Sequence, residues 1–255
     1  MTVLPSAEAW SADGGPAGVL VLHGFTGCPQ SMRGLAEACA AAGYAVELPR
    51  LPGHGTSVDD METTRWDDWY TAAESAYESL RRRCDAVVVA GLSMGGTLAT
   101  TLAARHDDVA GLVAINAAIE PIGAIRDQVR DSIAGGVTRW PAIGNDVADP
   151  EQKELAYDEV PVAAMGSLVE AVDALQPLLP QVRCPVLVLW SPQDHVVTND
   201  SSRLLMERVS GPSRLVRLER SYHVATLDYD REQIFAETVA FVADAAKQRS
   251  SHVDA

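Results

Sequence analysis

The segment GLSMG at 91–95 is the feature of this chain that most restricts its fold. It follows a β-branched apolar run at 86–90 and precedes a stretch of small residues that begins at Gly96. A strand, such a segment and then a helix form a nucleophile elbow, in which the flanking glycines allow a sharp turn and close packing of the helix. The pattern predicts that Ser93 is a nucleophile whose hydroxyl stands clear of a sheet edge at a helix N-terminus.

The rest of the chain alternates apolar runs with helical patterns, which is typical of a parallel sheet covered by helices on both faces. The expected strands lie near 18–23, 45–50, 86–91, 111–116, 185–190 and 214–218, and the expected helices near 29–42, 66–83, 95–106, 167–176, 201–209 and 231–246. A chain of 255 residues with 47% hydrophobic content usually forms one domain of this class. We therefore expect an α/β fold with a mostly parallel sheet, as a single domain over 1–255.

One connection, at 118–166, is too long for a simple crossover, and long excursions in compact domains are usually functional. Within it, Ile122, Ile125, Val129 and Ile133 are spaced by three, four and four residues, which predicts an apolar stripe on a short helix. Such a stripe more often packs into the core of the domain. In an insertion that covers an active site, however, the same side chains would face the substrate pocket. We expect a lid at approximately 118–166 in which Ile122, Ile125 and Ile133 line the pocket.

An activated serine needs a base and an acid that orients the base, and in elbow folds the acid and then the histidine follow the serine along the chain. Asp194 lies in the loop after the expected strand at 185–190. His223 follows the next strand and precedes the last helix. Because parallel strands carry functional groups at their carboxyl ends, these two residues should meet Ser93 at one sheet edge. An aspartate near proline is often only a turn residue, but the position of Asp194 after a strand favours the acid.

Other residues could compete for these roles. We interpret His195 as a bystander because it only neighbours the expected acid. Asp228 and Asp230 lie beyond His223, and Asp230 resembles the N-cap of the last helix.

The oxyanion donors should come from two backbone amides: one in the loop after the first core strand and one directly after the nucleophile. Loop 23–27 is rich in glycine, which allows an amide to point at a developing negative charge. We therefore predict the N–H groups of Phe25 and Met94 as donors. For His23 and His54 we expect structural roles within their own loops.

Charge and composition restrict the classes of molecule that the chain is expected to bind. A net charge of −15 disfavours nucleic acid and anionic membrane surfaces, so a neutral substrate is expected. Four cysteines without CxxC spacing indicate free thiols and no metal site. The N-terminus lacks a basic and apolar leader pattern and no run of eighteen apolar residues occurs, so a soluble, cytoplasmic protein without stable membrane insertion is expected.

Five motifs together resemble the bacterial monoacylglycerol lipases and their compact carboxylesterase relatives in the α/β-hydrolase superfamily. They are HGFTG at 23–27, LPGHGT at 51–56, GLSMGG at 91–96, DHVV at 194–197 and SYHVATLD at 221–228. The similarity spans nearly the whole chain, although the lid matches less well between 121 and 145. It implies a serine hydrolase that cleaves monoacylglycerols through an acyl-enzyme, without metal or organic cofactor. For the lid, we expect transient contact with lipid.

The resemblance also extends to KELAY at 153–157, whose family counterpart holds a glutamate that contacts the glycerol end of the substrate. On that match alone, Glu154 is a candidate ligand of the polar head. From its local pattern, a glutamate beside Lys153 is most often a solvated helix residue.

Several alternatives stay open at this point. A generalist carboxylesterase or thioesterase would use the same chemistry without recognising glycerol. Hydrolases of C–C bonds and cofactor-free haloperoxidases use similar triads on this fold. A ligand receptor on a hydrolase scaffold is a more distant possibility, which an intact elbow, acid and base disfavour. Acyl length, regioisomer preference and oligomeric state are not fixed by the sequence.

Overall fold

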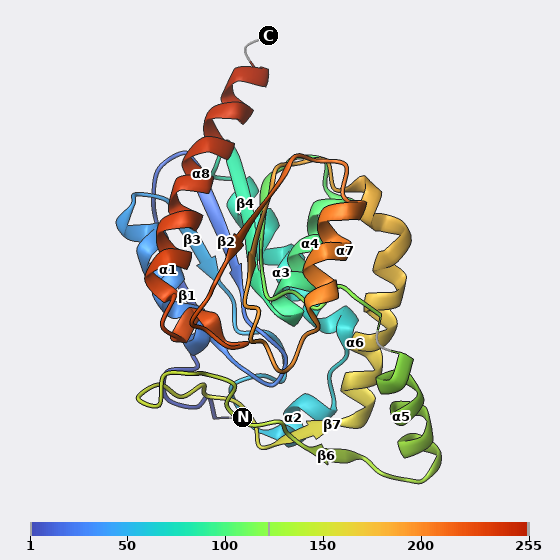
Figure 1. Cartoon of the computed structure of the whole chain (residues 1–255). Helices are drawn as coiled ribbons and strands as arrows, with labels where there is room; N and C mark the ends of the chain where they lie inside the picture. Colours follow the sequence, from blue (N-terminus) through green and yellow to red (C-terminus); the bar gives the residue numbers. More distant parts are fainter. Residues whose placement is uncertain (1, 122, 254–255) are drawn as a thin grey trace.

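A seven-stranded sheet forms the centre of the computed structural model, which describes residues 2–121 and 123–253, the last four by their backbone alone (Figure 1). The strand order is β1-β3-β2-β4-β5-β8-β9; β1 pairs antiparallel with β3 and all other neighbours are parallel. The expected α/β class with a mostly parallel sheet is confirmed. The strands are β1 (Trp10–Ala12), β2 (Ala17–Leu22), β3 (Ala45–Leu48), β4 (Ala86–Leu92), β5 (Val109–Ile115), β8 (Val186–Trp190) and β9 (Ser213–Arg217).

Helices cover both faces of the sheet, and its central strands β2, β4 and β5 are therefore buried along their whole length (Figure 1). In β2, Val19 and Val21 point into one core and Leu20 and Leu22 into the other, as the alternation of strand side chains requires. The first core is closed by α1 (Arg33–Ala41) and α8 (Arg231–Val253). The second core is closed by α3 (Trp66–Arg81), α4 (Met94–Arg105), α6 (Val162–Leu175) and α7 (Asn199–Arg208).

Short elements complete the chain, and the sequence patterns did not predict most of them. The helix α2 (Val58–Glu62) and the edge strand β1 are too short to give a periodic pattern. The described residues also include the short 3₁₀ helices η1 (Pro29–Met32), η2 (Gln176–Gln181) and η3 (Ala225–Leu227).

The connection from β5 to α6 holds the expected short helix, α5 (Gly123–Ala134), and then two strands that pair antiparallel with each other, β6 (Arg139–Pro141) and β7 (Glu159–Pro161). In Figure 1 this segment lies beyond the carboxyl ends of the central strands, below the sheet. The last residues of the expected lid belong to α6, which begins at Val162 and packs against α3, α4 and α5.

Together α6 and η2 form a stretch, Val162–Gln181, that is long and apolar enough to cross a membrane by length and composition alone. Its apolar side chains have another explanation. Leu168, Val172 and Leu175 belong to the core beside the sheet, and Met165 and Val169 line the pocket described below.

Candidate active site

Ser93 sits in a strained turn between β4 and α4, with φ 55° and ψ −121°. The turn depends on glycine at both flanking positions. A Cβ on Gly91 would lie 2.1 Å from the carbonyl oxygen of Gly95, and a Cβ on Gly95 would lie 2.2 Å from that of Leu22. No side chain fits there, because real Cβ contacts are never so short. A positive φ at a residue other than glycine is uncommon and occurs more often at functional sites, and here it presents the serine at the N-terminus of α4.

His223 and Asp194 form a hydrogen-bonded pair at the same sheet edge. The Nδ1 atom of His223 lies 2.8 Å from Oδ2 of Asp194, whose side chain is only 1% exposed. The second carboxylate oxygen, Oδ1, accepts the N–H groups of Val196 at 2.8 Å and Val197 at 2.9 Å. These bonds fix the carboxylate so that one oxygen faces the imidazole.

Ser93 and His223 line one cavity of about 220 Å³. Loop 23–27 and the connection between β5 and α6 form part of its walls. Within the described residues no hydrogen bond joins the Ser93 hydroxyl to His223, which is common before substrate binds. One wall is apolar and consists of residues of α6, namely Met165, Leu168, Val169 and Val172.

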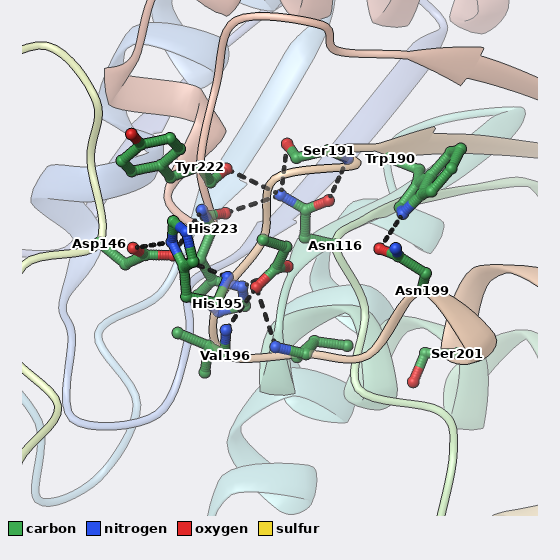
Figure 2. Close-up of polar contacts among 12 residues, drawn as sticks. Asn116, Asp146, Trp190, Ser191, His195, Val196, Asn199, Ser201, Tyr222 and His223 are labelled. Carbon is green, nitrogen blue, oxygen red and sulfur yellow. Dashed lines mark hydrogen bonds and ion pairs between the residues drawn. The ribbon is translucent and has the colours of Figure 1, made fainter.

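A second histidine–carboxylate pair lies beside the first. Nδ1 of His195 is 2.8 Å from Oδ1 of Asp146 (Figure 2). The His195 side chain is 58% exposed and is absent from the lining of the cavity among the described residues, whereas His223 is buried and faces it. The cavity therefore brings Ser93 together with His223 and not with His195.

The expected oxyanion donors lie beside the serine. A Cβ on Gly24 would be 3.4 Å from Cβ of Ser93, so loop 23–27 packs directly on the elbow. Met94 is the first residue of α4, and its N–H therefore has no partner inside the helix. The N–H of Phe25 donates to no acceptor in the part of the chain that the structure describes. Both amides are free to bind an oxyanion.

His23 and His54 each contact their own loop, as expected, and His23 also contacts the loop that holds His54. Nδ1 of His23 lies 2.9 Å from the carbonyl oxygen of Gly24. The Nε2 atom of His23 accepts the N–H of Leu51 at 3.2 Å, and Nδ1 of His54 lies 2.9 Å from the carbonyl oxygen of Pro52. Burial lowers the pKa of His23 to about 3 and that of His54 to about 4. Both rings are therefore neutral parts of the core near the site.

Glu154 lies in the wall of the cavity and in no helix, so it is not the solvated helix residue that its neighbours suggest. Its side chain packs on loop 23–27: a Cβ on Gly27 would be 2.6 Å from Oε1 of Glu154. The Gln30 side chain holds the flanking residues, since it donates to the carbonyl of Lys153 and accepts the N–H of Leu155. Burial raises the pKa of Glu154, although the nearby His223 opposes the rise.

The apolar stripe on α5 is only partly placed at the cavity. Ile125 lines it, and Val129 is buried. Ile133 is 56% exposed and borders a separate hollow, so its expected place in the pocket is corrected. Residues 125 and 133 are eight positions apart, which rotates the second side chain by about 80° on a helix of 3.6 residues per turn. Ile122 lies outside the described residues.

The sequence analysis missed two polar residues at this edge. Asn116 follows β5 with φ 41°, a conformation that asparagine tolerates better than most residues. Its Oδ1 accepts the N–H of Ser191, and its Nδ2 donates to the carbonyl of His223. A polar residue directly after a buried strand could have indicated Asn116. Nothing in the local pattern indicates Asp146.

Comparisons with known proteins show the family of the chain. Residues 19–237 match the model of the alpha/beta hydrolase family. A thermostable monoacylglycerol lipase of Bacillus sp. (strain H-257) is 45% identical over 243 residues, which are 94% of this chain and 96% of that protein. A carboxylesterase of Bacillus subtilis (strain 168) is 24% identical and covers 90% of this chain and 93% of its own length.

Solved structures of lipolytic enzymes share the fold of this chain. A structure from work on the metagenome-derived lipolytic enzymes LipS and LipT superposes with a TM-score of 0.92 at 40% identity, over 95% of this chain and 100% of the other. A monoacylglycerol lipase of Paleococcus ferrophilus, at 19% identity, shares the fold with a TM-score of 0.78, over 93% of this chain and 99% of the other. From the match of its sequence and from the fold of its relatives, the chain belongs to the alpha/beta hydrolase family.

Proposed function

We propose that this carboxylic ester hydrolase cleaves monoacylglycerols to glycerol and a free fatty acid through an acyl-enzyme on Ser93. The observation that carries the proposal is the single cavity shared by an elbow serine, a buried histidine–aspartate pair and a carboxylate, Glu154, in an otherwise largely apolar pocket. The 45% identity to a monoacylglycerol lipase over almost the whole chain supports this substrate.

In the proposed mechanism, His223 takes the proton of the Ser93 hydroxyl as the oxygen attacks the ester carbonyl. Asp194 stabilises the imidazolium and keeps the ring in the tautomer that leaves Nε2 free to accept. The Phe25 and Met94 amides bind the oxyanion of the tetrahedral intermediate. His223 then donates its proton to the departing glycerol oxygen, and water repeats the cycle to release the fatty acid.

Glu154 is proposed to bind the glycerol hydroxyls, because a site that selects a diol needs a strong acceptor and a carboxylate provides one. Glu154→Ala should lower kcat/KM for a monoacylglycerol by roughly ten- to a hundredfold, since a hydrogen bond to a charged group contributes about 1.5 to 3 kcal/mol. The methyl ester of the same fatty acid should be nearly unaffected, and Glu154→Gln should fall between. Equal losses for both esters, or none, would favour a generalist carboxylesterase.

The same carboxyl predicts a pH dependence of the head-group preference. Burial raises the pKa of Glu154, so its charge is lost at a higher pH than that of an exposed glutamate. The ratio of monoacylglycerol to methyl ester hydrolysis should therefore fall as the pH is lowered, and it should do so above the usual titration range of glutamate. Any loss that is common to both esters cancels in this ratio.

Ile125 is proposed to contact the acyl chain, and Ile133 provides a matched control on the same helix. Ile125→Ser should lower kcat/KM for a long-chain monoacylglycerol by about tenfold, since contacts of one or two methylenes are worth about 0.8 kcal/mol each. A short-chain substrate should lose little, and Ile133→Ser should leave both unchanged. Equal losses across a chain-length series would indicate that Ile125 only packs α5 in place.

We also propose a cytoplasmic location and transient contact of the lid with lipid. Reduced cysteines are typical of the cytoplasm, and the four thiols are unpaired. The segment between β5 and α6 also exposes the large apolar side chains of Val137 and Ile143. Such side chains would favour brief contact with an aggregate of amphiphilic substrate.

A further inference from the structure

The main chain of His223 is held on both sides by side chains from other parts of the sequence. Its carbonyl accepts a hydrogen bond from Nδ2 of Asn116 at 2.8 Å. Its N–H donates to Oδ2 of Asp146 at 3.0 Å (Figure 2). With the bond from its ring to Asp194, three side chains fix this one residue.

Asp146 bridges the loops that carry the acid and the base. The oxygen that accepts the N–H of His223 also accepts that of His195 at 3.2 Å, directly after Asp194. The other oxygen contacts the His195 ring at 2.8 Å. The carbonyl of Asp146 accepts the N–H of Val224 at 3.1 Å. One residue thus sets the distance between the two loops.

A second carboxylate anchors the segment that carries Asp146. Asp228 is fully buried and accepts the N–H of Tyr222 at 2.9 Å, next to the base. It also accepts the N–H groups of Ala148 at 2.7 Å and Asp149 at 3.1 Å. The segment is therefore anchored two and three residues after Asp146, which itself lines the cavity, and the Asp146 carboxylate can act as a rigid support.

We propose that Asp146 is a positioning residue: its carboxylate oxygen fixes the His223 peptide so that the imidazole is aimed at Ser93. This inference rests on the proposed function, because it assigns His223 as the base. A loop residue cannot hold a ring to the tolerance that proton transfer needs unless its backbone is fixed, and displacement by about 1 Å costs up to about a hundredfold in rate. Asp146 acts through His223 and contacts no reacting atom itself.

The neighbouring residue ties the same segment to the candidate head-group ligand. Oδ1 of Asn145 accepts the N–H of Glu154 at 2.8 Å. Asn145 thus holds Glu154, the proposed ligand of the glycerol head, and the adjacent Asp146 holds the base His223. This segment therefore fixes the spacing between the base and the proposed head-group ligand.

The test compares three variants. Asp146→Ala removes both acceptor oxygens and should lower kcat by about ten- to a hundredfold with KM changed less than about threefold. Asp146→Asn should recover most of kcat, because its amide oxygen can accept both N–H groups and its amide nitrogen can donate to Nδ1 of His195 in the other ring tautomer. His195→Ala is the matched control: it removes the ring contact, leaves the His223 bond, and should keep kcat within about threefold of the parent.

A spectroscopic readout separates positioning from general destabilisation. The proton between His223 Nδ1 and Asp194 should give a low-field NMR resonance that shifts or broadens in Asp146→Ala and is kept in Asp146→Asn. If Asp146→Ala does not fold, Asp146→Ser, whose hydroxyl is too short to reach the N–H, should show the same loss of kcat.

Three results would overturn the proposal: parent-like kcat in Asp146→Ala or Asp146→Ser, an equal loss in His195→Ala, or a loss in Asp146→Asn as large as in alanine. Ser93→Ala and Asp194→Asn, assayed alongside, test the proposed triad separately. If they are inactive while Asp146→Ala is parent-like, only the positioning role fails. If they stay active, the proposed function fails.

Discussion

Ser93→Ala should lower hydrolysis of a monoacylglycerol by at least about a thousandfold, since triad members act as a unit and the loss of one leaves only oxyanion and substrate binding. Folding should be unchanged. The Ser93 hydroxyl makes no hydrogen bond within the described residues, and alanine has nearly the same size and the same preference against positive φ. Steady-state rates and thermal unfolding of the variant check both statements.

Ser75→Ala is a suitable control, because Ser75 is an exposed residue of α3 away from the cavity. It should hydrolyse the substrate at the parent rate. Retention of more than a few per cent of activity in Ser93→Ala would mean that another group supplies the nucleophile.

Asp194→Asn is expected to have an effect of similar size, a loss of about ten-thousandfold in kcat. The structure gives the reason. One carboxylate oxygen accepts two N–H groups, from Val196 and Val197, so an asparagine oxygen must occupy that position. The amide nitrogen then faces Nδ1 of His223 and donates to it. That bond puts the ring proton on Nε2, and the imidazole can no longer accept the proton of Ser93.

A control on the second histidine–aspartate pair, His195 and Asp146, distinguishes the two possible assignments of base and acid. His195→Gln should retain nearly full activity because the His195 ring is exposed and lies outside the cavity lining that the structure describes. If Asp194→Asn were active while His195→Gln were inactive, the base would be His195 with Asp146 as its acid.

Local sequence patterns predicted the elements that place the serine. Short apolar runs that contain β-branched residues and the glycines of the elbow leave few alternatives, because the atoms nearest to a Cβ on Gly91 or Gly95 would be backbone atoms at 2.1 to 2.7 Å. The loop after β8 and the loop before α8 were found by the same logic, since parallel strands end at one edge. That logic also brought Asp194 and His223 to one edge, where the structure places them 2.8 Å apart.

The connection between β5 and α6 was harder to predict, because its position depends on tertiary contacts. The spacing of the apolar residues on α5 predicts that they share one face of the helix toward the pocket. The helical rotation instead turns Ile133 away from the cavity. Asp146 and Asn116 act through bonds to backbone groups more than seventy residues away, which no local period encodes. Glu154 was singled out by resemblance alone, and its place in the wall of the cavity came only from the structure.

The central claim is that Ser93 forms a covalent acyl-enzyme with an ester of glycerol. A fluorophosphonate, which reacts with activated serines as an ester would, tests it most directly. Intact-mass measurement and peptide mapping should find one adduct, on Ser93, and an added monoacylglycerol should slow its formation more than the methyl ester of the same acid does. No adduct on the parent, or an adduct on a different serine, would contradict the account.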